Sequence, residues 1–453
     1  MPSVLIKTYG CQMNERDTEQ VASMFLAGGY ELTDDEAAAD IILINTCSVR
    51  EKAELKALGK MGLLCSRPTA KPHVVYGFMG CMSQSRAHSL FRDIARLDVV
   101  TGTHQYHRVY ELCNRLLRSR LGMNITEPIA RGAHICSVQG EEGFQNKIKD
   151  HLPNPAGCSA FISIMQGCDM HCSYCIVPST RGEECSRPAA DILAEARELV
   201  SGGVKEITLL GQIVNRYGKD EPLVGGRSAF VRLLEALCEI DGLERLRFTS
   251  PHPIGFRDDL VRAYTYLPKL CSHIHFPMQS GSDRILQLMR RPYKHEKYER
   301  LCAAMREARP DLAITTDIIV GFPGETDEDF RLTVEAVERI QFDNAFVFQY
   351  SPRRDTPAAV MDAQICLRVK EERNHALLEV VNRIATARNH ALVGTVQSIL
   401  VEGPSKNNPL RLQGRTSQNK PVMIPAGSAS IGSIVPVHIT ECTGFTLYGD
   451  VQA

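Results

Sequence analysis

The chain has 453 residues, of which 43% are hydrophobic and 23% charged, a length that predicts about three domains and a composition typical of a soluble globular protein. The net charge of −1 and the absence of Trp argue against a protein that coats nucleic acid through bulk charge or an extended stacking platform. No apolar run reaches the roughly 18 residues of a membrane span, and the first residues do not resemble a secretory signal, so we expect a cytoplasmic protein.

The first 120 residues alternate short apolar runs with helix-like segments. The runs SVLIKTYG, ADIILINT and PHVVYGFMG predict strands of a flavodoxin-like or Rossmann-like parallel sheet over residues 1–120. Each run leads to one cysteine: Cys11, Cys47 or Cys81. Because ligands gather at the carboxyl ends of parallel strands, we expect three thiolates on one rim of the sheet. On the residues alone, the alternative is that these are buried core cysteines.

The rest of the chain predicts a linker and two further domains. Residues 121–157 are polar and are interpreted as a linker. Six apolar runs alternating with helical segments over 158–385 predict a parallel (βα)6 barrel, complete or open, with a charged helix at 367–390 leading out of it. Short alternating runs with Gly and Asn turns over 386–453 predict a small antiparallel β-barrel, an architecture common among oligonucleotide-binding domains. The predicted fold class is therefore α/β multidomain.

Three closely spaced cysteines follow the first barrel strand in the segment GCDMHCSYC: Cys168, Cys172 and Cys175. Thiolates select zinc or an iron–sulfur cluster, and a structural zinc site needs four ligands. His171 is the nearest fourth candidate, but its position beside Cys172 disfavours it. A 4Fe-4S cluster held by three thiolates leaves one iron open to a cofactor, and we prefer this interpretation. Zinc and inert core cysteines are the alternatives.

The triplet resembles the motif of the radical S-adenosylmethionine enzymes, whose fold is a (βα)6 partial TIM barrel, and Tyr174 matches the aromatic position of that motif. The resemblance implies that the open iron chelates the amino and carboxylate groups of S-adenosylmethionine (SAM). Iron–sulfur potentials reach down to about −700 mV, low enough for reductive cleavage of the sulfonium. The implied products are methionine and a 5′-deoxyadenosyl radical.

The segments KTYGCQMNERDTE, NTCSVREKAE and YGFMGCM resemble the N-terminal domain of the methylthiotransferases. The resemblance implies that Cys11, Cys47 and Cys81 hold a second, auxiliary 4Fe-4S cluster. It extends through CIVPSTRG, LLGQIVNRYG, RFTSPHP, FPMQSGSD, TTDIIVGFPGET and FQYSPRRDTPAA to GRTSQNK, which is similar to the RNA-binding TRAM domain. The chain departs from the usual family pattern at positions that remove no cluster ligand: Ser179, Ile213, Lys294, Arg354 and Asp355.

The form TYGCQMN is typical of the family branch that acts on isopentenylated adenosine in tRNA. The resemblance implies replacement of the C2 hydrogen of that base, beside the anticodon, by a methylthio group, with one SAM as methyl donor and a second as radical source. C2 carries no acidic proton and no leaving group, so a radical is needed. Expected partners are the anticodon stem-loop and a low-potential electron donor such as flavodoxin or ferredoxin, and a monomer suffices. The alternatives are methylthiolation of threonylcarbamoyladenosine or of a ribosomal protein, or a non-catalytic iron–sulfur RNA-binding protein.

Further candidate residues lie at strand ends and turns. The segment GFPGET could bring backbone amides close to the cofactor or be a plain tight turn. His273 and His275 are interpreted as packing residues. In the last domain, the alternative to RNA binding is a solvated turn. The candidates for SAM contact are Tyr174, Gly211, Gln212, Gln279, Ser280, Gly281, Asp317, Gly321 and Gly324, and those for RNA contact are Arg411, Arg415 and Lys420.

Overall fold

The computed structural model describes residues 1–48, 51–67, 71–123, 129, 132–139 and 157–452. The chain forms two compact units, each described by itself. The N-terminal unit comprises Met1–Leu152, Gln166–Met170 and Cys175–Arg187, and the C-terminal unit comprises Pro153–Met165, His171–Tyr174 and Pro188–Ala453. In the described parts of the chain, no helix has the length and apolar character needed to cross a membrane.

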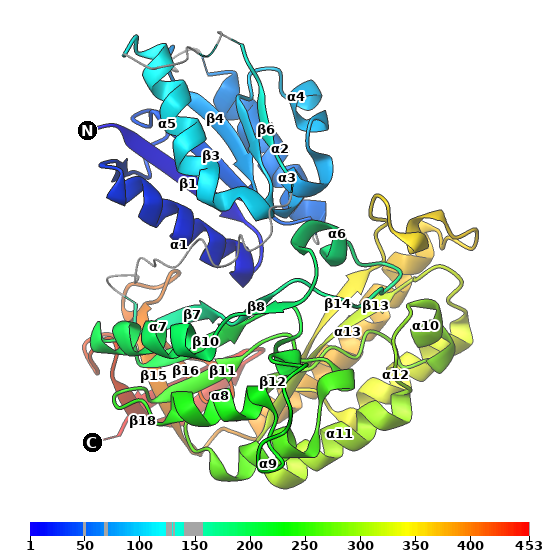
Figure 1. Ribbon diagram of the computed structural model, residues 1–453. Helices are drawn as coiled ribbons and strands as arrows, with labels where there is room; N and C mark the ends of the chain where they lie inside the picture. Colours follow the sequence, from blue (N-terminus) through cyan, green and yellow to red (C-terminus); the bar gives the residue numbers. More distant parts are fainter. Residues whose placement is uncertain (49–50, 68–70, 124–128, 130–131, 140–156, 453) are drawn as a thin grey trace. The chain divides into compact units, whose positions relative to one another are not determined.

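The N-terminal unit contains a six-stranded parallel sheet in the order β2-β1-β3-β4-β5-β6. Strands β3 and β4 are completely buried because helices cover both faces of the sheet (Figure 1). Apolar side chains of α1 and α5 pack on one face, and those of α2, α3 and α4 on the other. This confirms the predicted flavodoxin-like or Rossmann-like sheet. The strands are β1 (Ser3–Tyr9), β2 (Glu31–Leu32), β3 (Ile41–Thr46), β4 (Val75–Met79), β5 (Val99–Thr101) and β6 (Ile135–Ser137).

The helices of this unit connect its parallel strands. They are α1 (Gln12–Ala27), α2 (Glu51–Cys65), α3 (Cys81–Arg86), α4 (Ser89–Asp93), the 3-10 helix η1 (Thr103–Arg108), α5 (Val109–Arg120) and α6 (Val177–Arg181). Strand β6 lies inside the segment 121–157 that the sequence predicts to be a linker, and it pairs with β5 at the sheet edge. Most of the remaining predicted linker lies outside the described residues.

The C-terminal unit contains the six predicted barrel strands as two three-stranded parallel sheets, β11-β10-β7 and β12-β13-β14. A parallel bridge between Leu246 and Leu270 links the two sheets. Neighbours in space follow the order of the chain, as a parallel βα barrel requires. The strands are β7 (Ser159–Ser163), β10 (Glu206–Leu210), β11 (Arg245–Phe248), β12 (His273–His275), β13 (Ala313–Val320) and β14 (Asn344–Gln349). Two further short strands pair with each other: β8 (Met165–Gln166), which crosses the division between the units, and β9 (Cys185–Ser186), which belongs to the N-terminal unit.

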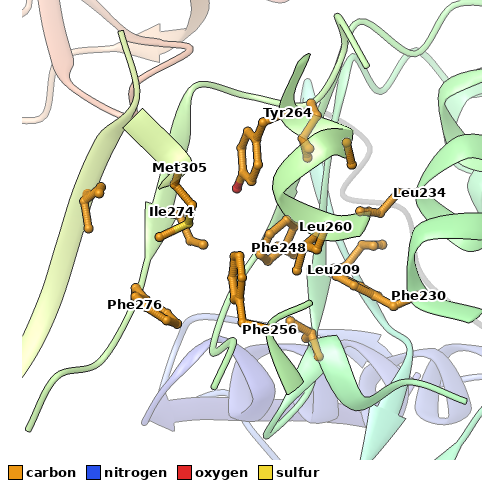
Figure 2. Packing of buried hydrophobic residues seen from close by; sticks show 14 of the residues in the cluster. Leu209, Phe230, Leu234, Phe248, Phe256, Leu260, Tyr264, Ile274, Phe276 and Met305 are labelled. Carbon is orange, nitrogen blue, oxygen red and sulfur yellow. The ribbon is translucent and has the colours of Figure 1, made fainter. Parts of the chain in front are cut away.

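Helices pack against the outer face of these strands through one large apolar core. Figure 2 shows Phe248 of β11 between Phe230 of α8 and Tyr264 of α9, with ring centroids 5.3 Å and 6.3 Å away. Because side chains alternate along a strand, the outward residues supply this core and the inward ones remain for a site. The helices are α7 (Ala189–Ser201), α8 (Ala229–Cys238), α9 (Asp258–Tyr266), α10 (Asp283–Leu288), α11 (His295–Ala308), α12 (Asp327–Ile340) and α13 (Leu367–His390), with short 3-10 turns η3 (Val214–Arg216), η4 (Pro253–Gly255) and η5 (Pro357–Val360).

The last residues form a closed five-stranded barrel in the order β15-β16-β17-β19-β18. The sequence predicts an antiparallel barrel, but β17 and β19 pair in parallel. An odd number of strands cannot alternate in direction all the way round, so closure requires one parallel pair. Helix α13 continues past the expected boundary at residue 386 before the barrel begins. The strands are β15 (Val396–Pro404), β16 (Arg411–Thr416), β17 (Pro421–Pro425), β18 (Ile434–Thr443) and β19 (Thr446–Val451).

The turn between β16 and β17 docks on the amino ends of the larger barrel's strands. Arg247 of β11 donates hydrogen bonds to the carbonyls of Thr416 (2.7 Å) and Ser417 (2.8 Å). The Ser272 amide, just before β12, donates to the Ser417 hydroxyl at 2.9 Å. The Gln418 side chain donates to the Asp311 carbonyl, just before β13, at 2.6 Å. The small barrel therefore covers the amino ends and leaves the carboxyl ends for a site.

Candidate metal and cofactor centres

The three dispersed cysteines meet at the carboxyl edge of the sheet in the N-terminal unit. Cys11 follows β1 as the N-cap of α1, Cys47 follows β3, and Cys81 follows β4 as the first residue of α3. Because β1, β3 and β4 are parallel neighbours, their carboxyl ends share one edge. The thiols of Cys11 and Cys47 are hydrogen-bonded to each other. The predicted common rim is therefore present in the structure.

Two asparagines support this rim. Asn14 Oδ1 lies 3.3 Å from the Cys11 amide and 3.4 Å from its thiol, and both groups donate to it. The Asn14 side-chain amide donates to Asn45 Oδ1 at 3.0 Å. The residues before two of the cysteines must be glycine: a Cβ on Gly10 would lie 2.4 Å from Asn14 Oδ1, and one on Gly80 (φ 101°) would lie 2.3 Å from Asn45 Oδ1. The Gly-Cys pairs of the sequence thus leave room for the asparagines that hold the cysteine loops.

A buried arginine adjoins the same cysteines. Arg181 of α6 donates from Nε to Cys81 Sγ at 3.3 Å, and its Nη1 and Nη2 atoms donate to the Asp17 carboxylate at 3.2 Å and 2.6 Å. The Tyr106 hydroxyl donates to the same carboxylate at 2.8 Å. Sequence reasoning missed Arg181, Asp17 and Tyr106, because nothing in the local pattern links positions so far apart.

This environment shifts the acidity of two thiols in opposite directions. The hydrogen bond with Cys47, together with the charge of Arg181, lowers the pKa of Cys11 to about 6 despite burial. Burial raises the pKa of the Cys81 thiol, although Arg181 opposes the change. A thiolate is the form that binds iron. Three neighbouring thiols, one of them acidified, and a compensating cation therefore fit a thiolate-held cluster.

The triplet occupies the loop between β8 and α6, and the division between the two units runs through this loop. In the N-terminal unit, the Cys168 amide donates to the Gly182 carbonyl at 3.0 Å, and the Met170 amide donates to the Cys168 sulfur at 3.4 Å. Gly167 has φ 83°, and a Cβ there would lie 1.8 Å from the Glu183 carbonyl oxygen, so only glycine fits.

In the C-terminal unit, Cys172 and its neighbours rest on the carboxyl end of the larger barrel. Arg291 donates from Nη1 to Cys172 Sγ at 3.5 Å, and its guanidinium lies 5.2 Å from the Tyr293 ring centroid. Ser173 binds the backbone on both sides, since its amide donates to Met289 and its carbonyl accepts from Ala358. Arg291 was another residue that the sequence pattern did not reveal.

Among the described residues, no three His, Cys, Asp or Glu side chains are arranged to hold one metal ion. The thiolate ligands of a cubane cluster each bind a different iron, so they stand further apart than the ligands of one zinc. The described geometry thus offers no mononuclear zinc site, whereas the two cysteine sets retain the donor chemistry of clusters.

The inner face of the sheet β12-β13-β14 is polar and aromatic. His275 and Asp317 form a contact of 3.1 Å between Nε2 and Oδ2. On β14, Ala345 is buried in the core, whereas Phe346 and Phe348 are 52% and 41% exposed. Phe346 pairs in register with Asp317, and its ring centroid lies 5.8 Å from that of His275. This face can therefore receive a planar or apolar ligand.

Several predicted cofactor residues have contacts within the fold. Gln279 has φ 70° and bridges to β13, through its amide to Asp317 (2.8 Å) and its carbonyl to Ile319 (2.9 Å). Ser280 is 1% exposed and faces Thr333, and a Cβ on Gly281 would lie 2.6 Å from the Leu332 carbonyl oxygen. These contacts explain the residues structurally, and their binding of SAM stays a prediction.

The other predicted cofactor residues differ in the contacts that they make within the chain. Gln212 Oε1 is buried and receives no hydrogen bond from the described residues, so it can accept one from a ligand. A Cβ on Gly211 would lie 2.6 Å from Met165 Cγ. Gly321 and Gly324 have φ of 68° and 80°, and the Gly321 amide donates to Glu325 at 2.8 Å, as in a tight turn.

Tyr174 packs beside the turn that contains Gly321 and Gly324. Its ring lies 6.4 Å from that of Phe322, in an apolar cluster that also contains Tyr350. The aromatic position before the last cysteine of the triplet therefore anchors the loop on the barrel, and a contact with the cofactor is a separate prediction.

The predicted RNA-binding residues lie largely at the docked amino end of the larger barrel. The ammonium of Lys420 donates to Asp343 Oδ1 at 3.0 Å and to Asn389 Oδ1 at 2.6 Å, and its side chain is 8% exposed. Arg415 contacts Glu206 at 2.9 Å and Glu402 at 2.5 Å. These carboxylates compensate both charges inside the chain, so Lys420 in particular offers no free charge to a phosphate.

Arg411 is placed differently. Its guanidinium lies 5.1 Å from the ring centroid of Tyr448 on the surface of the small barrel. It is half-buried, and among the described residues no carboxylate forms an ion pair with it, so its charge can still contact an RNA phosphate.

Three family models match successive parts of the chain. They are the uncharacterized protein family UPF0004 at residues 3–102, the radical SAM superfamily at 162–337 and the TRAM domain at 390–452. The radical SAM match implies SAM and a 4Fe-4S cluster.

Full-length relatives share one name, tRNA-2-methylthio-N(6)-dimethylallyladenosine synthase. The protein from Akkermansia muciniphila is 61% identical, covering 99% of this chain and 98% of its own length. The proteins from Methylacidiphilum infernorum and Opitutus terrae are 49% and 47% identical over 99% and 100% of this chain, and 94% and 98% of their own length.

Solved structures agree in fold. The radical SAM methyltransferase TsrM from Kitasatospora setae, with tryptophan substrate and a SAM analogue bound, superposes with a TM-score of 0.57 at 14% identity. The match covers 86% of this chain and 90% of that one. At this identity the likeness shows the fold alone, and it supports the arrangement of the partial barrel.

Proposed function

This chain belongs to the family of the tRNA-2-methylthio-N(6)-dimethylallyladenosine synthases, and on that premise we propose that it methylthiolates C2 of the isopentenylated adenosine beside the tRNA anticodon. The observation that carries the proposal is the 61% identity to the protein from Akkermansia muciniphila. The aligned region covers 99% of this chain and therefore includes both cysteine sets. A tRNA substrate also gives the ground for proposing a cytoplasmic location.

In the proposal, Cys168, Cys172 and Cys175 hold the radical SAM cluster. When bound, this cluster with SAM would supply reductive sulfonium cleavage and hence the radical that removes the C2 hydrogen. The carboxyl ends of the barrel strands hold the loop: Ser173 ties it to Met289 and Ala358, and Tyr174 packs beside Phe322. Arg291 donates to the Cys172 sulfur and keeps a positive charge beside it. Gln212 Oε1 is a candidate acceptor for the amino or hydroxyl groups of SAM.

We further propose that Cys11, Cys47 and Cys81 hold an auxiliary 4Fe-4S cluster. When bound, it would supply an open iron at which a sulfide can be methylated and passed on. The donor set is suited to this role because the three thiols share one strand edge and Cys11 has a low pKa. Asn14 and Asn45 would keep the thiolates oriented.

The substrate base is proposed to lie on the inner face of β12–β14. Phe346 and Phe348 would contact the adenine ring and its apolar dimethylallyl chain, because exposed aromatic faces stack bases. His275 and Asp317 offer a polar edge beside them. A low-potential protein donor such as flavodoxin or ferredoxin would supply electrons, and a monomer contains all these residues.

The test uses the full chain, reconstituted anaerobically with iron and sulfide. Reduced protein with SAM should yield 5′-deoxyadenosine, and with tRNA that carries isopentenyladenosine it should yield the 2-methylthio base by mass spectrometry. Absence of 5′-deoxyadenosine would favour a non-catalytic iron–sulfur RNA-binding protein. Cleavage of SAM with product only on threonylcarbamoyladenosine tRNA or a ribosomal protein would assign another substrate.

Cys47→Ala separates the two centres. This variant should cleave SAM and fail to transfer the methylthio group, because it lacks one ligand of the proposed auxiliary cluster and keeps the triplet. The matched control is Cys65→Ala, a buried cysteine on α2 in the same unit that lies away from the strand rim. Normal methylthiolation by Cys47→Ala would overturn the auxiliary assignment and leave the radical SAM assignment intact.

A further inference from the structure

Helix α6 brings an arginine from the triplet loop to the other cysteine set. It begins two residues after Cys175 and ends at Arg181, whose side chain reaches Cys81. The next residue, Gly182, accepts the amide hydrogen bond of Cys168. All of these residues belong to the N-terminal unit, and α6 packs there against α3 and η1. Arg181 therefore occupies a short, fixed segment.

The arginine is built into its position. Both Arg181 (2% exposed) and Asp17 (5% exposed) are buried, and two parallel N–H···O contacts join them. Such a bidentate pair fixes the plane of the guanidinium. The Tyr106 hydroxyl donates to Asp17 Oδ2, the oxygen that also accepts from Arg181 Nη2. The Thr103 hydroxyl donates to the Thr180 carbonyl, which anchors the end of α6.

The guanidinium stays charged in this site. Arginine keeps its proton in proteins, and the Asp17 carboxylate, at 3.2 Å and 2.6 Å from the two Nη atoms, compensates its buried charge. Its third contact, from Nε, goes to sulfur and not to oxygen. Hydrogen bonds to thiolate sulfurs and nearby charge are among the features that set the potential of an iron–sulfur cluster.

We infer that Arg181 is a positioning residue that donates a hydrogen bond to the Cys81 ligand of the proposed auxiliary cluster and, with Asp17, sets the charge next to that cluster. This inference rests on the proposed function, because it needs the auxiliary cluster. Removing Asp17 alone leaves an uncompensated cation, which favours the more negative, reduced cluster. Removing both residues eliminates the ion pair without leaving a buried charge, and it deletes the hydrogen bond to sulfur.

The experiment measures the reduction potential of the auxiliary cluster in the full chain with Cys172→Ala, so that the triplet cluster does not contribute. In this background, Asp17→Asn should shift the potential to more positive values. The double variant Arg181→Met with Asp17→Asn should shift it to more negative values. Arg181→Lys, which keeps the charge, should lie between the double variant and the parent.

The matched control is the pair Arg120 and Asp98, which lies in the same unit and contacts Val74 and Tyr76 instead of a candidate ligand. Arg120→Met with Asp98→Asn should leave the potential unchanged. An unchanged potential, or shifts of the same sign, in the two Asp17 variants would overturn the role of Arg181 while the cluster assignment stands. If the Cys172→Ala parent bound no iron, the assignment of an auxiliary cluster would be wrong, and this inference would be wrong with it.

Discussion

The two ends of the larger barrel are built from different chemistry. At the amino end, Glu206 on β10 is fully buried among three arginines: Arg247 (3.0 Å), Arg415 (2.9 Å) and Arg245 (3.9 Å). At the carboxyl end, the loop with Cys172 is held by backbone contacts, and Phe346 and Phe348 stay exposed. Ion pairs thus fill the amino end, whereas the carboxyl end keeps exposed aromatic side chains. We therefore expect substitutions at the amino end to change stability and substitutions at the carboxyl end to change activity.

The largest effect is expected at the carboxyl end. Cys172→Ala should reduce 5′-deoxyadenosine formation to background, because the triplet cluster then lacks a ligand and cannot present SAM. The assay is product quantification after reduction, with thermal unfolding as a check on the fold. The control is Cys185→Ala, an exposed cysteine ten positions from Cys175. If Cys185→Ala reduced 5′-deoxyadenosine formation equally, the loss would not be specific to the triplet at the carboxyl end, and the comparison of the two ends would fail.

At the amino end, Glu206→Gln should affect stability. It leaves buried guanidiniums without their carboxylate, and breaking a buried ion pair in this way costs about 3–5 kcal/mol. The measurement is the free energy of unfolding by denaturant, together with SAM cleavage per folded molecule at low temperature, which should be retained. A large loss of cleavage without a loss of stability would contradict the comparison.

The same residue predicts a pH dependence. The surrounding arginines lower the pKa of Glu206 in the folded chain although burial opposes them. Its contribution to stability is therefore fully present above the unfolded pKa of about 4.3 and decreases as the pH falls through the lower folded pKa. The parent should lose stability on acidification below about pH 5 more steeply than Glu206→Gln, as measured by denaturant unfolding over a pH series.

A smaller loss is expected for Lys420→Met. Asp343 would lose its contact with the ammonium but keep the Arg388 contact at 2.9 Å, so the cost should be about 1–3 kcal/mol. Affinity for tRNA, measured at low temperature on folded protein, should change little, because this ammonium is already bound within the chain. Arg411→Met is the matched comparison and should weaken tRNA binding more. A larger tRNA effect from Lys420→Met would restore the prediction that it contacts RNA.

The smallest effect concerns single stacking contacts on the inner face. Phe348→Ala or Phe346→Ala should weaken the transition-state complex with tRNA by about 1–3 kcal/mol, roughly thirtyfold in kcat/KM at the middle of that range. SAM cleavage without tRNA should stay close to the parent rate. Phe445→Ala, an exposed phenylalanine (43%) in the small barrel, is the control. Equal effects in all three would remove the proposed base site from this face.

The prediction from sequence worked where the signal is local. Strand and helix periodicity predicted the parallel sheet, the six barrel strands and helix α13, and the three cysteines of the triplet are within one loop. The short edge strand β6 was not predicted, since three residues in a polar segment carry no periodicity. The turn 416–420 has the composition of a solvated basic loop, yet it docks on the amino ends of β11–β14.

By itself, the sequence predicted most of the helices and strands and indicated the cysteines that we propose as cluster ligands, because backbone preference and side-chain chemistry are properties of neighbouring residues. Only the tertiary structure decided that β1, β3 and β4 are adjacent, that Arg181 meets Asp17 and Cys81, and that Lys420 is buried against Asp343. A charge acquires its role from the partner that folding brings to it, and in a chain with 52 basic and 53 acidic residues local sequence cannot identify that partner.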